Sequence, residues 1–279
     1  MRFSTAMILS WKKVLSEAAV LSFLLTGTAL FGARAQPLEL IACTPIPEPA
    51  GVSVDRSGNV YLADRRGNVI LYNSEGIETL VFSPPRPAVI SNLEAWHGLR
   101  IFCFFRDLQE YTFLNRFLIS PGNYSFGAGI VFAEAAGPSF DNNLWVFDQG
   151  DFTLKKYNVN LKEIQSLTPL ILLLDQDNYD IAFIREHQNR VYLDDRRSGI
   201  LVFDNLGTYI NTLPIPEIDY FNFWEDRLYF LQSEMLISIS LYGPERLERA
   251  LPEGGNWKFA LYAGGQYFLF SDKQLCRCK

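Results

Sequence analysis

The chain has 279 residues and a formal net charge of −6, and 48% of its residues are hydrophobic and 14% aromatic. This length allows two ordinary domains or one large all-β domain. Lys and Arg form no block or stripe that would neutralise phosphates, so neither nucleic acid nor an anionic membrane surface is an expected partner.

Residues 1–35 have the features of a signal peptide. Basic residues at 2, 12 and 13 precede an apolar run over 18–30, which is shorter than the roughly 20 residues of a membrane span. Ala33-Arg34-Ala35 fits the small-x-small cleavage rule and predicts a cut before Gln36. An uncleaved membrane anchor is the alternative. Cleavage removes four of 25 basic and one of 31 acidic residues, which leaves residues 36–279 with a net charge of −9.

A lipid anchor at Cys43 is a second way to hold the chain at a membrane. Leu40-Ile41-Ala42-Cys43 has the residue types of a lipobox, but Arg34, Pro37 and Glu39 separate it from the apolar run. We therefore expect an exported protein that is periplasmic, associated with the outer membrane, or secreted.

A repeated pattern covers the rest of the chain. A turn leads into an aromatic and β-branched run, then polar residues, then a second apolar run, most clearly at 58–72 and 189–204. Both of these copies carry an Arg pair between the runs. Six aromatic residues serve as markers at intervals of 37 to 47 residues, near the period of a four-stranded propeller blade: Tyr61, Phe102, Trp145, Tyr192, Tyr229 and Tyr267.

The repeat predicts an all-β fold, a six-bladed β-propeller with four-stranded antiparallel blades. Leading strands are expected at 51–54, 93–96, 129–132, 180–184, 221–224 and 257–261. The last unit has only three strands, whereas an unassigned apolar stretch at 38–42 precedes the first, so we expect the N-terminal strand to close the ring. An outer-membrane barrel is the rival fold, but these strands lack its regular lipid-facing alternation.

The first repeat, Ala50-Gly51-Val52-Ser53-Val54-Asp55 followed by residues 57–64, resembles an NHL repeat. The wider chain is similar to six-bladed NHL-type propellers of secreted or envelope proteins. The resemblance implies a fold more than a function, because propellers of this class bind proteins, glycans or nucleic acid, and some relatives are hydrolases or lyases.

The four cysteines are at positions 43, 103, 276 and 278. Ring closure places Cys43 beside Cys276 or Cys278, and a disulfide there would stabilise by about 4 to 5 kcal/mol in the chain-entropy model. Free buried thiols and metal binding by the same three cysteines are the alternatives. Cys103, between two phenylalanines, is expected to be a buried apolar residue.

The sequence contains no GxSxG, HExxH, Walker A or dinucleotide-binding motif. His97 and His187 both lie in expected hairpin turns, where a solvated role is favoured over catalysis. The acidic stretch 175–180 lacks the Gly and Glu of a calcium loop and is interpreted as a turn.

Leading strands line the channel of a propeller, so residues near their starts are candidate binding residues. We expect Glu94, Asp180, Asn222 and Lys258 to meet at one mouth, where they would either pair with one another or, as in six-bladed lactonases that use calcium, hold a metal. No catalytic residue, metal ligand set or cofactor is assigned from the sequence.

Aromatic residues provide the other candidate surface. Trp96, Trp224 and Trp257 fall near expected blade starts, where they would form a core or a protein or glycan platform. The favoured function is a non-enzymatic scaffold that binds another envelope protein. The alternatives are a metal-dependent lactonase or hydrolase with its site in the channel, and a carbohydrate-binding propeller.

Overall fold

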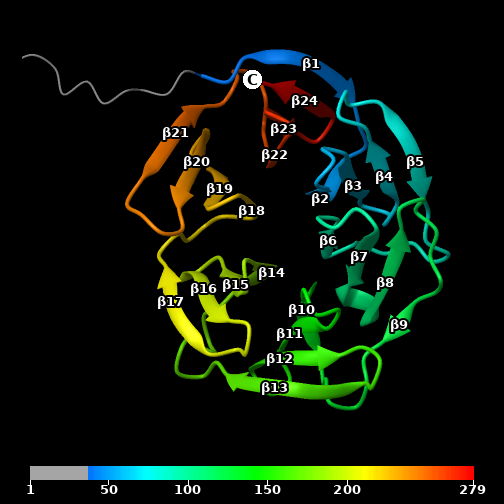
Figure 1. Ribbon diagram of the computed structural model, residues 1–279, viewed down its shortest axis with the longest axis vertical. Coiled ribbons are helices and arrows are strands. Elements are labelled where there is room, and N and C mark those ends of the chain that lie inside the picture. Colours follow the sequence, from blue (N-terminus) through cyan, green and yellow to red (C-terminus); the bar gives the residue numbers. More distant parts are fainter. Residues whose placement is uncertain (1–36) are drawn as a thin grey trace, which may run out of the picture. The chain divides into compact units, whose positions relative to one another are not determined.

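Six separate four-stranded antiparallel sheets surround a central axis in the computed structural model, which describes residues 37–279 (Figure 1). Five of the sheets are meanders whose first strand faces the axis and whose last strand lies at the rim, and the sixth has the N-terminal strand at its rim. The predicted six-bladed β-propeller is confirmed. The predicted signal peptide, 1–35, falls outside the described residues.

The strands follow the chain from blade to blade. Blades 1 to 3 contain β2 (Pro49–Val54), β3 (Val60–Asp64), β4 (Val69–Tyr72), β5 (Glu78–Phe82), β6 (Asn92–Glu94), β7 (Arg100–Phe105), the short 3-10 helix η1 (Arg106–Leu108), β8 (Glu110–Asn115), β9 (Tyr124–Ser125), β10 (Ala133–Pro138), β11 (Leu144–Asp148), β12 (Thr153–Asn158) and β13 (Glu163–Pro169). Blades 4 and 5 contain β14 (Ile181–His187), β15 (Arg190–Asp195), β16 (Gly199–Asp204), β17 (Tyr209–Leu213), β18 (Phe221–Trp224), β19 (Arg227–Gln232), β20 (Met235–Ser240) and β21 (Arg246–Ala250).

The sixth blade joins the two ends of the described chain. Its strands are β22 (Phe259–Ala263), β23 (Gln266–Phe270), β24 (Gln274–Cys278) and, at the rim, β1 (Leu40–Pro45). β1 pairs antiparallel with β24 and places Cys43 opposite Cys276, and the two form a disulfide. Ring closure by the N-terminal strand is thus confirmed, and Cys278 and Cys103 remain buried free thiols.

The hydrophobic core is divided into six clusters, one at each interface between neighbouring blades. The six marker aromatics all lie on the second strand of their blades. Five of them are at most 3% exposed. Because both faces of a blade are covered, the central strands carry continuous apolar runs rather than alternating ones.

The first strand of blade 3 is the main error of the sequence prediction. It was expected at 129–132, but β10 occupies Ala133–Pro138. The expected segment is held as a loop, because the Asp148 carboxylate accepts hydrogen bonds from the backbone N–H groups of Val131 and Phe132 at 2.8 and 2.9 Å. The strand itself is rich in Ala and Gly, which gives no β signal.

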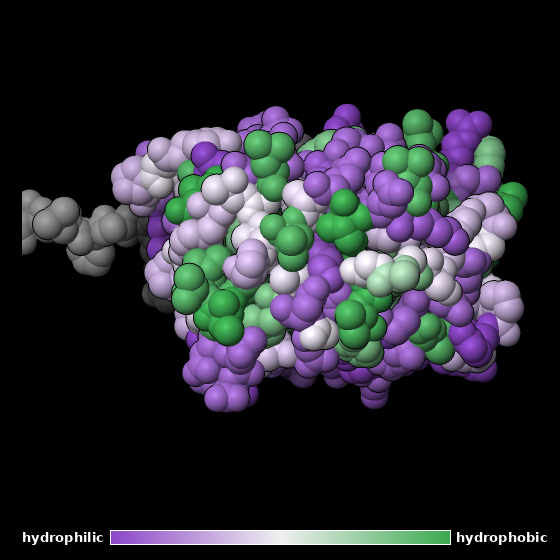
Figure 2. Space-filling model, turned by 90° about the horizontal axis from the view of Figure 1, so that it is seen from below, coloured by the Kyte–Doolittle hydropathy of each residue, from purple (hydrophilic) through white to green (hydrophobic). Residues whose placement is uncertain are grey.

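Viewed from the side, the rim shows apolar residues singly or in small groups among polar ones (Figure 2). The outermost strand β13 shows the reason, since its residues alternate between exposed and partly buried. Within residues 37–279, no helix has the length and apolar character needed to cross a bilayer.

Candidate functional site

The central channel has two mouths. We call the end formed by the hairpins between first and second strands, such as 95–99 and 188–189, the hairpin mouth. The opposite end, where inter-blade loops such as 83–91 and 251–258 enter the first strands, is the loop mouth. The first strands run between the two mouths, so residues near the start and the end of such a strand face different cavities.

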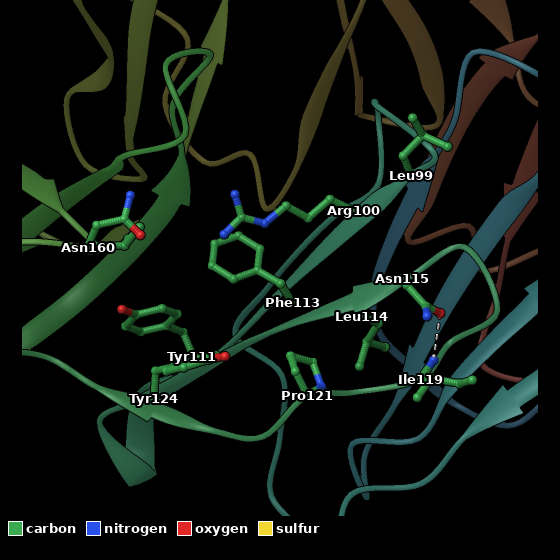
Figure 3. Close-up of a pocket in the computed structure, with 11 residues that line it drawn as sticks. Leu99, Arg100, Tyr111, Phe113, Leu114, Asn115, Ile119, Pro121, Tyr124 and Asn160 are labelled. Atoms are coloured by element: carbon green, nitrogen blue, oxygen red, sulfur yellow. Dashed lines mark hydrogen bonds between the residues drawn. The ribbon is translucent and has the colours of Figure 1, made fainter.

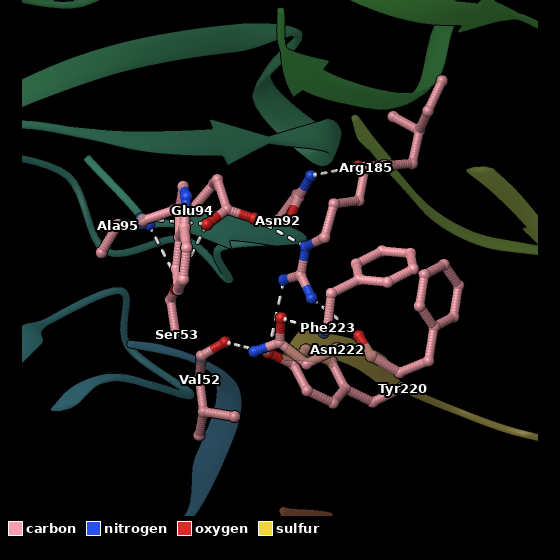
Figure 4. Close-up of polar contacts among 12 residues, drawn as sticks. Val52, Ser53, Asn92, Glu94, Ala95, Arg185, Tyr220, Asn222 and Phe223 are labelled. Atoms are coloured by element: carbon pink, nitrogen blue, oxygen red, sulfur yellow. Dashed lines mark hydrogen bonds and ion pairs between the residues drawn. The ribbon is translucent and has the colours of Figure 1, made fainter. Parts of the chain in front are cut away.

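Arg185 of β14 occupies the middle of the ring, with its side chain 5% exposed. Its Nε donates to Glu94 Oε2 at 2.7 Å, and its two terminal nitrogens donate to the Phe221 carbonyl at 2.7 Å and the Tyr220 hydroxyl at 3.3 Å. Burial alone would lower the pKa of this guanidinium, but the Glu94 carboxylate and Tyr220 together outweigh burial and hold the pKa above its ordinary value. One side chain thus connects blades 2, 4 and 5 (Figure 4).

Glu94 is fully engaged as the counter-ion of Arg185. Its other oxygen, Oε1, accepts a hydrogen bond from the Ser53 hydroxyl at 3.2 Å and from the Trp96 backbone N–H at 3.1 Å. The side chain is only 13% exposed. A carboxylate held by three donors in this way connects blades 1, 2 and 4 and stabilises the architecture of the channel.

Asn92 connects blades 2, 3 and 4 near Arg185 in the channel (Figure 4). Its Nδ2 donates to the carbonyls of Ala136 at 2.9 Å and Ile184 at 3.1 Å. The small residues of β10 permit this approach, because a Cβ on Gly137 would lie 2.5 Å from the Ile184 carbonyl oxygen. The Ala and Gly composition of β10 therefore has a packing function.

Asn222 completes the network from blade 5. Its Nδ2 lies 3.4 Å from the Tyr220 hydroxyl, and that hydroxyl donates to the Val52 carbonyl of blade 1 at 3.0 Å. Its Oδ1 accepts from the Phe223 backbone N–H at 2.8 Å. The channel is therefore occupied by paired polar side chains from four blades, and a backbone carbonyl of blade 3 joins the network.

Both histidines line a small cavity of about 40 Å³ at the hairpin mouth, together with Glu94 and Asn222. His97 is exposed, as predicted for a turn residue. His187, the last residue of β14, is partly buried: its ring stacks on Phe223 at 4.2 Å and its Nε2 lies 2.8 Å from the Glu225 carbonyl oxygen. Burial lowers the pKa of His187, which favours the neutral ring.

Lys258 belongs to the loop mouth, where it lines a cavity of about 330 Å³. It pairs with Asp272 and, at 3.8 Å, with Glu48. Asp180 pairs with Arg196 at 2.8 Å, and Arg196 lines the same cavity. The charges on this side of the ring are therefore satisfied by neighbours.

The four expected channel residues consequently do not meet. Glu94 and Asn222 line the hairpin mouth, whereas Lys258 and the partner of Asp180 line the loop mouth. The reason is the strand register: Glu94 ends β6 and Asn222 lies within β18, but Asp180 and Lys258 precede β14 and β22. Across residues 37–279, no group of three or more His, Cys, Asp or Glu side chains is placed to hold a metal ion.

The three tryptophans are also separate. Trp96 lines the hairpin-mouth cavity, Trp224 lines a pocket between blades 5 and 6, and Trp257 lines a third cavity beside the inter-blade loop 251–258. Trp257 lies two residues before β22 and donates from its indole N–H to the Pro252 carbonyl at 2.9 Å. All three are partly buried, so they form no common aromatic platform.

A hollow with apolar and aromatic walls lies between blades 2 and 3, and we call it the blade 2–3 groove (Figure 3). Its volume is about 500 Å³, and its lining includes Leu99, Tyr111, Phe113, Ile119 and Tyr124. The outer strand β9 pairs with only two residues of β8, so few outer-strand side chains cover this part of the interface. Sequence reasoning missed the groove, although the Pro121-Gly122 pair that interrupts the fourth strand was a signal.

One cation lies in the blade 2–3 groove (Figure 3). The Arg100 guanidinium lies over the Phe113 ring at 3.4 Å and donates to Asn142 at 3.3 Å. It forms no ion pair within residues 37–279. Burial of part of the side chain lowers the pKa of Arg100, but the residue as a whole is exposed.

The sequence matches no protein-family model, and no curated protein shows a match to it. Several solved structures share its fold. A streptogramin B lyase is 13% identical and superposes with a TM-score of 0.61, covering 85% of this chain and 97% of its own. The WD40 domain of Pan2 from Neurospora crassa is 7% identical, with a TM-score of 0.59 over 86% and 95% of the two chains.

BamB from Moraxella catarrhalis is a third structure of this kind, 9% identical, with a TM-score of 0.52 over 87% of this chain and 99% of that one. These likenesses show the fold. At such identities they assign neither an activity nor a partner, because unrelated functions share the propeller.

Proposed function

We propose that this chain is a non-enzymatic propeller of the cell envelope or the secreted fraction that binds another protein through the blade 2–3 groove. The observation that carries the proposal is the exposure of large apolar side chains at the groove: Leu99 is 70% exposed, Ile119 61% and Tyr124 43%. Apolar and aromatic residues gathered at a hollow with a polar rim are typical of a protein-binding site.

The occupant that fits the groove is an apolar segment of a partner that also carries a carboxylate. Tyr111, Phe113 and Tyr124 supply aromatic contact area, and Arg100 supplies a charge that lacks a counter-ion. A partner carboxylate would form a charge-assisted pair with this exposed guanidinium, and the complementary charges would add specificity. The occupied channel supports this choice over the hydrolase, because Glu94 is already bound by three donors and Glu186, which lines the same mouth, accepts from Ser139 and Trp145.

Export is part of the same proposal. The disulfide that closes the ring is of the kind that persists in oxidising compartments, and the N-terminal features of the sequence favour secretion.

The test uses two single variants of the full chain, expressed in its native cells. Leu99→Asp places a charge in the groove, and Leu172→Asp places the same charge on an equally apolar residue, 94% exposed, in the loop between β13 and β14. We expect one protein to co-purify in near-stoichiometric amount with the wild type and Leu172→Asp. Its affinity for Leu99→Asp, measured by calorimetry with the purified partner, should fall at least tenfold. Undiminished binding to Leu99→Asp, or no stoichiometric partner of the wild type, would overturn the proposal.

A further inference from the structure

A second pocket, of about 140 Å³, lies between blades 5 and 6 and differs in chemistry from the blade 2–3 groove. We call it the blade 5–6 pocket. Six of its lining side chains are hydrogen-bond donors with large flat groups: Trp224, Arg227, Tyr229, Arg249, Tyr262 and Tyr267. No Asp or Glu lines it, although the chain as a whole is acidic.

The two arginines give this pocket an uncompensated positive charge. Within residues 37–279, neither Arg227 nor Arg249 forms an ion pair, whereas the channel arginine Arg185 has a carboxylate partner. Arg227 is held in place because its Nε donates to the Ser238 hydroxyl at 2.7 Å and a terminal nitrogen donates to the Ser238 carbonyl at 3.0 Å. Arg249 lies over the Tyr267 ring at 5.7 Å. A fixed guanidinium is the preferred binding group for a carboxylate.

The pocket walls are aromatic rings set at angles to one another. Trp224 and Tyr262 lie 4.8 Å apart at 77°, and Tyr262 and Tyr267 lie 4.7 Å apart at 51°. The Tyr229 hydroxyl accepts the Tyr262 backbone N–H at 2.9 Å. The hydroxyls of Tyr262 and Tyr267 and the indole N–H of Trp224 make no hydrogen bond to any described residue.

From these features we propose that the blade 5–6 pocket binds an acidic sugar unit, a pyranose ring that carries a carboxylate. Arg227 and Arg249 bind the carboxylate. The aromatic rings form the walls against which the apolar face of the sugar lies, and the two phenols and the indole form hydrogen bonds with its hydroxyl groups. Phenols both donate and accept, which suits a ligand rich in hydroxyls.

An acidic side chain of a peptide fits the pocket less well. Its carboxylate would use the guanidinium groups but leave the free phenols and the indole without partners. The sugar satisfies both sets of groups, and its compact ring suits a pocket of about 140 Å³. The site is independent of the blade 2–3 groove, so either proposal can fail without the other.

The experiment is a titration of the full exported chain, followed by calorimetry, with D-glucuronate, D-galacturonate and N-acetylneuraminate. D-glucose and N-acetyl-glutamate amide serve as ligands that lack either the charge or the sugar ring. Arg249→Gln removes a pocket guanidinium, and Arg246→Gln is the matched control, because Arg246 lies on the same strand and pairs outside the pocket with Glu248 at 2.7 Å. Circular dichroism confirms that both variants are folded.

We expect at least one acidic sugar to bind the wild type and Arg246→Gln with similar affinity and to bind Arg249→Gln at least tenfold more weakly. D-glucose and the glutamate derivative should also bind the wild type at least tenfold more weakly. The proposal is overturned if no acidic sugar shows saturable binding, if the two arginine variants behave alike, or if the glutamate derivative binds as tightly as the sugars.

Discussion

Asp194 is a buried carboxyl without a partner. It lies on β15 at the place where the matching sequence of blade 1 has Ala63, and both residues are 0% exposed. Within the described part of the chain, neither oxygen of Asp194 makes a hydrogen bond. Burial raises the pKa of this carboxyl well above its ordinary value of 3.8, so the folded protein retains the proton to a higher pH than the unfolded chain does.

This difference in proton binding makes stability depend on pH. The folded state binds more protons than the unfolded state between pH 3.8 and the raised pKa, so the free energy of unfolding falls as pH rises through that window, by about 1.4 kcal/mol per unit. Asp194→Asn lacks this term. We expect the free energy of unfolding of the variant, measured with urea at pH 5, 6 and 7, to increase relative to that of the wild type as pH rises. A constant difference, or the same trend with exposed Asp177→Asn, would contradict the prediction.

The blade turns repeat one hydrogen-bonding arrangement. In the turn at Asp64, the carboxylate accepts the backbone N–H groups two and four residues later, at 2.8 and 2.9 Å, and Gly67 adopts a φ of 83°. The turn at Asp55 does the same with Gly58, at a φ of 82°. A side chain in this left-handed region costs about 1 to 2 kcal/mol.

Two substitutions separate the conformational cost of a positive φ from the cost of a steric clash. A Cβ on Gly58 would lie 3.8 Å from its nearest neighbour, whereas one on Gly67 would lie 2.2 Å from the Ala88 carbonyl oxygen. We expect Gly58→Ala to lower the free energy of unfolding by about 1 kcal/mol, and Gly67→Ala to lower it at least twice as much. Equal losses in chemical denaturation would show that the loop at Ala88 moves aside without cost.

The same contrast explains what the sequence predicts at the level of elements. Turns and second strands are predictable, because Asp, Asn, Gly and aromatic runs act locally. β10 is not predictable, because Gly137 is needed for close packing against Ile184 and Asn92, which are distant in the chain. Composition therefore predicts a strand only where the residues favour strand formation locally.

At the scale of the whole molecule, the period of the repeat was sufficient to predict the six blades and the closure of the ring. It was not sufficient to predict the candidate binding sites. Arg185 was not a candidate, since only the folded ring places it beside Glu94, 91 residues away. Trp224 was a candidate, yet the two arginines that give its pocket a charge lie on other strands. Functional pockets between blades depend on which side chains meet across an interface, and a repeat pattern does not contain that information.

The Cys43–Cys276 disulfide fastens the ring, because it links residues 233 apart at the only blade built from both ends of the described chain. In the chain-entropy model a loop of this size stabilises by about 5 kcal/mol. The variant Cys43→Ser with Cys276→Ser should therefore melt at least about 10 °C lower, and amides of β1 and β24 should exchange faster than those of β15. Reductant should lower the melting temperature of the wild type to that of the variant and leave the variant unchanged. If wild type and variant melt together, the pairing of β1 with β24 holds the ring closed without the covalent bond.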